Sequence, residues 1–392
     1  MKPNCSRRDF LGAASMAASA FIAGPRILSA AQAPASRVAI GLCPEYNRQV
    51  SEVLATMFDQ LGGLDMLVRG KTVAIKLNLT GDPGMKLGTM PNEMTHWVHP
   101  QVIGSLVSLL GQAGAARIRL LESNPGGTKP LEEFMISGGW QPRGFAAAAR
   151  RVEFENTNFL GSGKSYARFM VPGGALMYAG YDLNHSYQDT DVYVSLAKLK
   201  EHRTAGVTLS MKNTFGITPA TIYSDEAPQD EPAVVPVGFR GPMHSGSRVP
   251  PKSAPQPVAE SKDPGFRVPR VTADLVAARP IHLAVIDGIY TMTAGELPYQ
   301  TKSKEWVNKA IHPGLLIAGM NCVCTDAVAV AVMGFDPMAD RGTPPFEKCD
   351  STLRLAEGLG VGTRDLKRIE VVGTPIAKAR YKFPPLTQLT KA

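Results

Sequence analysis

Short apolar runs alternate with amphipathic stretches along most of the chain. Runs rich in aliphatic and β-branched residues predict seven strands: Val38–Leu42, Thr72–Asn78, Arg117–Glu122, Asp191–Leu196, Ile281–Asp287, Leu315–Gly319 and Ile369–Gly373. Apolar residues at helical spacing predict helices near Val50–Leu67 and at Pro100–Gly114, Cys322–Met333 and Thr352–Leu359. Gly- and Pro-rich turns follow several strands. This order predicts an α/β fold, with a mostly parallel sheet covered by helices on both faces.

One internal segment departs from this alternation. Residues 219–269 contain eleven prolines, few long apolar residues and no hydrophobic period. Such a stretch buries too little surface to build a core of its own. We therefore expect a single α/β domain over residues 32–392 in which 219–269 is a Pro-rich insertion, either a lid over a cleft or a flexible insert.

The first 31 residues have the order of an export signal. Arg7 and Arg8 precede a weakly apolar run from Leu11 to Gly24, and Ser29–Ala31 offers a cleavage site before Gln32. A paired arginine before such a run predicts a twin-arginine signal peptide. The expected partner is the twin-arginine translocation machinery, and the expected location is the periplasm. Because this route carries proteins that fold or load a cofactor before export, it favours a bound cofactor.

Composition and charge argue against several classes of function. The 392 residues carry a formal net charge of +8, which falls to +5 without residues 1–31, and the excess is spread along the chain. This distribution and an aromatic content of 7% argue against a nucleic-acid partner. No later stretch is long and apolar enough for a stable membrane span. The absence of Cys-x-x-Cys leaves a self-contained iron–sulfur cluster without a framework, so the cofactor stays unknown, with a metal as one option.

The densest group of reactive side chains follows the fourth predicted strand. If that strand continues, Lys198, Lys200 and His202 alternate and project to one face, and Lys212 and Asn213 follow closely. Two ammonium groups and an imidazole near a strand end favour an anion as ligand. The alternative is a solvated edge with extended lysines.

Two further residues, Lys76 and Asn78, end the second predicted strand before a Gly/Pro turn. A lysine inside an apolar strand is costly to bury without a partner. Lys76 therefore either reaches solvent or points into the same anion site, and Asn78 joins it as a candidate substrate-binding residue.

Acidic residues close to these cations are candidates for holding a metal or orienting a base. Asp287 ends a strand, Asp326 lies in an Ala/Val-rich helix, and Glu296 lies on a turn after Asp287. Asp326 has the simpler alternative of complementing a helix dipole.

Other metal-type pairs have simpler explanations. Cys322 and Cys324 are two residues apart on a helix and cannot share a face, so we expect core residues. For His96 and His99 we expect capping or packing rather than a metal. The nucleotide, esterase and zinc-protease motifs are absent from the sequence.

The ordered set of these segments resembles the domain of unknown function 362 family over roughly residues 72–373. The segments that carry the resemblance are Val73–Asn78, Leu196–His202, Leu209–Asn213 with Gly216, Ala284–Gly288, Thr325–Ala329 running to Gly334, and Leu359–Gly362. The family has no assigned reaction, but the resemblance implies an iron–sulfur or redox context. This chain departs from the family in lacking cluster cysteines, in having Leu77 where proline is usual, and in its long insert.

Two functions of different class remain. In the first, the chain is a metal- or cofactor-dependent enzyme acting on an anionic small molecule. Its catalytic residues would be His202, Lys200 and Lys212, its substrate-binding residues Lys76, Asn78, Lys198 and Asn213, and its metal ligands Asp287 and Asp326. In the second, the same lysines belong to a non-catalytic binding or accessory protein that captures an anionic solute, metal or cofactor.

Overall fold

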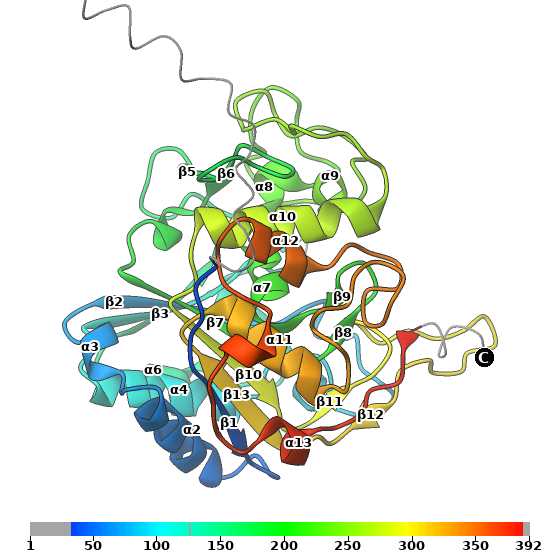
Figure 1. The fold of residues 1–392 in the computed structure, drawn as a ribbon. Helices are drawn as coiled ribbons and strands as arrows, with labels where there is room; N and C mark the ends of the chain where they lie inside the picture. The colour runs from blue at the N-terminus through cyan, green and yellow to red at the C-terminus, as the bar shows by residue number, and fades with distance from the viewer. Residues whose placement is uncertain (1–32, 125–126, 387–392) are drawn as a thin grey trace, which may run out of the picture.

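The computed structural model describes residues 33–124 and 127–386, which build an eight-stranded central sheet (Figure 1). From one edge to the other the strands are β14 (Val371–Gly373), β1 (Val38–Leu42), β13 (Leu315–Gly319), β10 (Leu283–Gly288), β7 (Val192–Lys198), β2 (Thr72–Lys76), β3 (Arg117–Glu122) and β4 (Val152–Asn156). Only β13 pairs antiparallel with its neighbours within this sheet, and every other pairing is parallel. The predicted α/β fold with a mostly parallel sheet is confirmed.

Helices cover both faces of the sheet, and strand residues alternate between the two resulting cores. In β7, Val194 and Leu196 face one core while Tyr193 and Ala197 face the other. The first core is closed by α2 (Gln49–Gln60), α4 (Pro100–Gln112), α5 (Leu131–Ser137) and α6 (Pro142–Ala146). The second is closed by α7 (Leu209–Thr214), α10 (Pro264–Ala278), α11 (Cys322–Val332) and α12 (Thr352–Gly358). Burial on both faces explains why these strands read as continuous apolar runs.

Most element bounds lie within a few residues of the predicted ones. Two differences stand out. The sequence pattern does not predict β4 of the central sheet, and the helix expected near Val50–Leu67 is split into α2 and a short α3 (Asp65–Val68). Gly62 and Gly63 lie between them with φ angles of 103° and 83°, a backbone conformation that a right-handed helix cannot contain.

The Pro-rich insert packs against the domain. Its short helices α8 (Ala220–Tyr223) and α9 (Gly241–His244) lie beside α10 (Figure 1). Tyr223 and Met243 are fully buried in the second core. The insert ends at Asp263 rather than at 269, because Asp263 caps α10 by accepting a hydrogen bond from the Gly265 N–H at 2.8 Å.

Smaller elements complete the described chain. They are the ribbons β5 (Ala167–Met170) with β6 (Gly180–Leu183), β8 (Glu201–His202) with β9 (Gly206–Val207), and β11 (Thr291–Met292) with β12 (Ala310–Ile311), and the helix α13 (Ile376–Ala379). None of the helices in the described ranges is long and apolar enough to cross a membrane. The segment expected to be a twin-arginine signal lies outside the described residues.

Candidate functional site

The carboxyl ends of four neighbouring parallel strands carry charged residues. Lys76 ends β2, Glu122 ends β3, Lys198 ends β7, and Asp287 lies one residue before the end of β10. Each is at most 4% exposed. Open α/β sheets bind their ligands at this edge. The structure therefore brings Lys76, Lys198 and Asp287, three of the predicted site residues, to the same edge.

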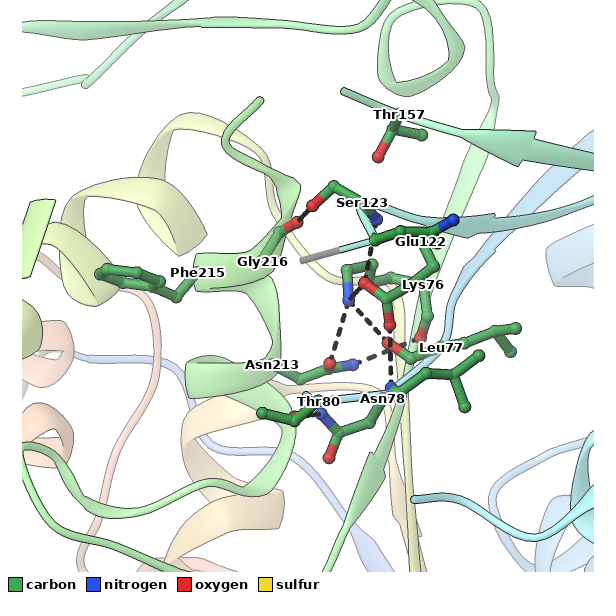
Figure 2. Close-up of polar contacts among 12 residues, drawn as sticks. Lys76, Leu77, Asn78, Thr80, Glu122, Ser123, Thr157, Asn213, Phe215 and Gly216 are labelled. Atoms are coloured by element: carbon green, nitrogen blue, oxygen red, sulfur yellow. Dashed lines mark hydrogen bonds and ion pairs between the residues drawn. The ribbon is translucent and has the colours of Figure 1, made fainter. Parts of the chain in front are cut away.

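Lys76 is held in a buried ion pair (Figure 2). Its Nζ lies 2.5 Å from Glu122 Oε1 and donates to the Leu77 carbonyl at 2.7 Å and to Asn213 Oδ1 at 3.4 Å. Burial lowers the pKa of Lys76, and the Glu122 carboxylate opposes this shift. A Cβ at Gly216 would lie 3.1 Å from Nζ, so glycine permits this close approach. Lys76 thus does not reach solvent, because a carboxylate from the neighbouring strand neutralises it.

The two predicted asparagines hold the backbone around the lysines. Asn213 Nδ2 donates to the carbonyls of Lys76 and Leu196, both at 3.3 Å, which fastens α7 to β2 and β7. Asn78 Oδ1 accepts a hydrogen bond from the Lys198 N–H at 3.2 Å. Both side chains lie at the predicted edge, where they position neighbouring residues.

Lys198 is fully buried and has three partners. Its Nζ lies 3.0 Å from Asp287 Oδ2 and 2.9 Å from both the Tyr46 hydroxyl and the Glu93 carbonyl. The Asp287 carboxylate also accepts hydrogen bonds from the Tyr46 hydroxyl at 2.9 Å and the His99 N–H at 3.0 Å. Burial lowers the pKa of Lys198, and Asp287 opposes this shift. Every donor of this ammonium is therefore used inside the protein.

Lys200 is also fully buried, but its partners carry no charge. Its Nζ donates to the His96 carbonyl at 2.8 Å, to the Glu296 carbonyl at 3.2 Å and to Thr80 Oγ1 at 3.3 Å. Burial lowers its pKa to about 7, since no carboxylate hydrogen-bonds to the ammonium. Lys200 thus ties two surface loops to the chain that follows β7.

His202 lies beyond the end of the sheet, on the β8–β9 ribbon. The condition that the β7 strand continues through His202 is not met, because β2 ends at the level of Ser195 and β10 pairs with β7 only as far as Lys198. His202 Nδ1 accepts a hydrogen bond from the Thr204 N–H at 3.2 Å, which assigns the ring proton to Nε2. The side chain retains 6% exposure. Burial lowers its pKa well below the usual value, so at neutral pH the ring is an uncharged donor.

Glu296 is the carboxylate nearest to His202. Its Oε2 lies 3.8 Å from His202 Nδ1 and accepts a hydrogen bond from the Arg203 N–H at 3.1 Å. Burial alone would raise the pKa of Glu296, but His202 and the hydrogen bond from Arg203 outweigh it and bring the pKa to about 2. Glu296 therefore stays ionised and supplies negative charge beside the site.

Lys212 differs from the other three lysines. It is only partly buried, and its Nζ forms no hydrogen bond with a side chain or carbonyl of the described residues. The ammonium lies 4.0 Å from the centre of the Phe215 ring, a cation–π contact. Burial lowers its pKa to about 7; Glu296 opposes this shift, while Arg240 and Lys76 add to it. Among the predicted cations, Lys212 has the hydrogen-bond donors to offer a ligand.

Sequence reasoning missed two basic residues that the insert brings to the same place. The Arg240 guanidinium donates from Nη2 to Ser123 Oγ and from Nε to the Thr218 carbonyl at 2.7 Å. His244 packs its ring against Phe215, with 4.7 Å between ring centres. Their position in the sequence gives no signal of this proximity. Glu122, by contrast, ends a predicted strand and could have been found by the reasoning applied to Lys76.

Asp326 lies apart from the lysines. Its Oδ1 accepts hydrogen bonds from the Ser210 N–H at 2.9 Å and hydroxyl at 2.5 Å, and its Oδ2 accepts one from the Met211 N–H at 2.9 Å. Burial raises its pKa to about 7 despite these bonds. Asp326 thereby anchors the start of α7, the helix that carries Lys212 and Asn213.

A metal role for Asp287 and Asp326 stays a prediction. The two carboxylates share no hydrogen-bond partner within the described residues, and each is occupied by donors of the protein itself. The same part of the chain contains no group of three or more His, Cys, Asp and Glu side chains that could hold a metal ion.

The expected roles of the remaining candidates are confirmed. His99 caps α4 through the Gln101 N–H at 3.0 Å, and its ring stacks on Tyr46 with 3.6 Å between centres. His96 is fully buried. The four cysteines of the described residues are buried and unpaired: Cys43, Cys322, Cys324 and Cys349.

Two cavities are lined by parts of the structure other than Lys200, His202 and Lys212. One of about 780 Å³ is lined by parts of the insert and of residues 159–168. Another, of about 510 Å³, is lined by Trp140, His99 and Glu93, close to Lys198. Neither is lined by Lys200, His202 or Lys212, so neither of these two cavities includes the proposed reactive residues.

Comparison with known proteins decides the family. The family model described as Domain of unknown function (DUF362) matches residues 73–331. The chain belongs to this family. The match includes all nine predicted site residues and the whole insert. No curated protein matches the chain.

Two solved structures resemble the chain at low similarity. A protein from Thermotoga maritima has 14% sequence identity and a TM-score of 0.35, covering 71% of this chain and 56% of that one. The lactate racemase apoprotein from Thermoanaerobacterium thermosaccharolyticum has 11% identity and a TM-score of 0.32, covering 72% and 55%. The DUF362 chain thus spans little more than half the length of either structure.

Proposed function

We propose that the protein binds a small anionic molecule at Lys212 and acts on it as an enzyme. One observation carries this proposal: Lys212 is partly exposed and has no hydrogen-bonding partner for its ammonium among the described residues, whereas Lys76, Lys198 and Lys200 are buried and fully partnered. An unused, partly desolvated ammonium binds an anionic group more strongly than one in open water.

The groups around Lys212 suit proton transfer. Its pKa of about 7 lets the amine exist in both protonation states at neutral pH. The His202 imidazole is uncharged and has a free Nε2 proton to donate, while the Glu296 carboxylate beside it stays ionised. Lys212 would hold the anion and, with its pKa of about 7, exchange a proton with it, while His202 would donate a hydrogen bond to it.

A binding assay tests the proposal without knowledge of the reaction. Sodium sulfate is titrated into the purified protein at pH 6.5 and followed by calorimetry, using wild type and Lys212→Met. The control is Lys252→Met, because Lys252 is an exposed lysine of the insert in a surface ion pair. We expect Lys212→Met to weaken binding about tenfold or more, from loss of a partly buried charge, and Lys252→Met to leave it unchanged. Equal binding by all three proteins contradicts the proposal.

We further propose export through the twin-arginine route, which rests on the sequence of residues 1–31 alone. Replacement of both Arg7 and Arg8 by lysine should hold the protein in the cytoplasm, as measured by cell fractionation. Mass spectrometry and elemental analysis of natively exported protein, purified without chelators, would then identify any anion or metal that travels with it.

A further inference from the structure

The Pro-rich insert reaches the sheet edge through one arginine. Arg240 precedes α9, and its guanidinium bonds to Ser123 Oγ, directly after the end of β3. Ser123 Oγ also donates to the Gly216 carbonyl, next to the ring that supports Lys212. These contacts fix a cation of the insert at the turn that follows α7. The Nη1 group of Arg240 has no hydrogen-bond partner within the described residues.

His244 is placed by the same turn of the insert. Its Nδ1 donates to the Arg240 carbonyl at 2.8 Å, which leaves Nε2 without a proton. The ring contacts one side of the Phe215 side chain, while Lys212 Nζ lies over the ring at 4.0 Å. Nε2 of His244 therefore has no hydrogen-bond partner within the described ranges, and the charge of Lys212 acts on this ring.

The charges around this point do not cancel. Lys76 is neutralised by Glu122 at 2.5 Å, and Glu296 offsets one further charge. Lys212 and Arg240, whose charges act on each other, leave an excess of positive charge that no carboxylate of the described residues pairs with. A ligand with a single negative charge would leave part of this excess uncompensated in a partly desolvated place, which costs free energy.

We propose that Arg240 forms the second half of the anion site and that, together with Lys212, it selects a ligand that carries two negative charges close together. This inference rests on the proposed anion binding at Lys212. The shared chemistry of the ligand is a pair of charges within one small molecule, either on one tetrahedral group or on two neighbouring carboxylates. The unprotonated Nε2 of His244 can accept a hydrogen bond from a protic group of that ligand.

The test compares three anions by calorimetry: sulfate, malonate and acetate. For the wild type we expect sulfate or malonate to bind about tenfold more tightly than acetate, since each meets both cations. The stronger of the two identifies the geometry of the charges. Arg240→Gln should bring the ratio of dianion to acetate affinity close to one, and Lys252→Gln, a charge loss elsewhere in the insert, should not change it.

A second variant and a chemical probe distinguish a loss of anion binding from misfolding of the Arg240→Gln variant. His244→Asn keeps a donor for the Arg240 carbonyl and removes Nε2. It should weaken the binding of hydrogen phosphate, which has a proton to donate, about threefold and leave the binding of sulfate unchanged. In unaltered protein, saturating sulfate should slow the modification of Arg240 by phenylglyoxal, read by peptide mass spectrometry, but not that of Arg248, whose guanidinium bonds to the Asp225 carbonyl.

The outcomes separate the two proposals. If no anion binds the wild type and Lys212→Met changes nothing, the proposed function fails and this inference fails with it. If sulfate binds through Lys212 while Arg240→Gln keeps the dianion preference and sulfate leaves Arg240 unprotected, only the role of the insert is overturned.

Discussion

Lys198 and Lys212 are fourteen residues apart in the sequence but have opposite environments. Lys198 has no exposed surface and gives all its donors to Asp287, Tyr46 and the Glu93 carbonyl. Lys212 is partly exposed, and in the part of the chain that the structure describes its ammonium has the Phe215 ring as its contact and no hydrogen-bond partner. The difference teaches that a lysine at a strand end can serve the fold instead of a ligand. What distinguishes the two is whether a neighbouring strand or loop supplies a carboxylate.

The largest effect should come from breaking the Lys198 pair. Asp287→Asn removes the counter-charge of a fully buried ammonium and weakens the acceptor of the Tyr46 and His99 hydrogen bonds. We expect a loss of about 3–5 kcal/mol in the free energy of unfolding, measured by urea denaturation. Asp65→Asn is the control, since its pair with Arg69 is exposed and should contribute less than about 1 kcal/mol. Similar losses in the two variants would show that Lys198 and Asp287 are not a structural pair.

Lys200→Met should give a smaller loss of stability and no loss of anion binding. The three neutral oxygens that accept from Lys200 would be left without this donor in a buried place, which costs about 1–3 kcal/mol. Sulfate affinity should stay within about twofold of the wild type, because the ammonium is enclosed by protein. A variant that unfolds normally but binds sulfate poorly would move Lys200 from the structural group into the binding site.

The contrast between Lys198 and Lys212 also shows which features of the site can be predicted from the sequence. The strand ends at Lys76 and Asp287 were predicted within two residues, because alternating apolar runs and Gly/Pro turns are local signals. These strand ends also predicted that the charged residues meet at the carboxyl edge of the sheet. The pairing of Lys76 with Glu122 was not predictable, since it depends on which strand lies beside β2.

The role of the insert could not be predicted from the sequence. Its eleven prolines obscure any hydrophobic period, and Arg240 meets Ser123 across 117 residues of sequence. Only the packing of α9 against α10 sets this distance. The same holds for Asp326, whose helix partner α7 is more than a hundred residues away.

The pH dependence of sulfate binding should distinguish Lys212 from the buried lysines. The charged form of Lys212 prevails below its pKa of about 7, so sulfate affinity should be high at pH 6 and should fall about tenfold by pH 8. Sulfate is chosen because its own charge is constant over this range. The other groups that face Lys212 are Glu296, which is ionised in this range, Arg240, and Lys76, which is paired with Glu122. Two histidines, His202 and His244, face it as well, and the lowered pKa of each keeps its ring neutral.

Lys200 is the group that could imitate this profile, because burial lowers its pKa to about 7 as well. The profile should therefore persist in Lys200→Met and disappear in Lys212→Met. If the pH dependence is lost in Lys200→Met but kept in Lys212→Met, the buried Lys200 and not Lys212 is the group whose protonation controls binding.

The smallest effect tests what holds Lys212 in place. Phe215→Leu keeps an apolar side chain in the core but removes the ring face under the ammonium. A cation–π contact contributes about 0.5–1 kcal/mol to the charged form, so its loss should lower the pKa of Lys212 by roughly half a unit. The midpoint of the sulfate pH profile should move down by the same amount, while affinity at pH 5.5 stays close to that of the wild type. The free energy of unfolding must be measured alongside, because Phe215 is itself buried. A loss of stability with an unmoved midpoint would mean that the ring only fills the core, and that the exposure of Lys212 alone makes it different from Lys198.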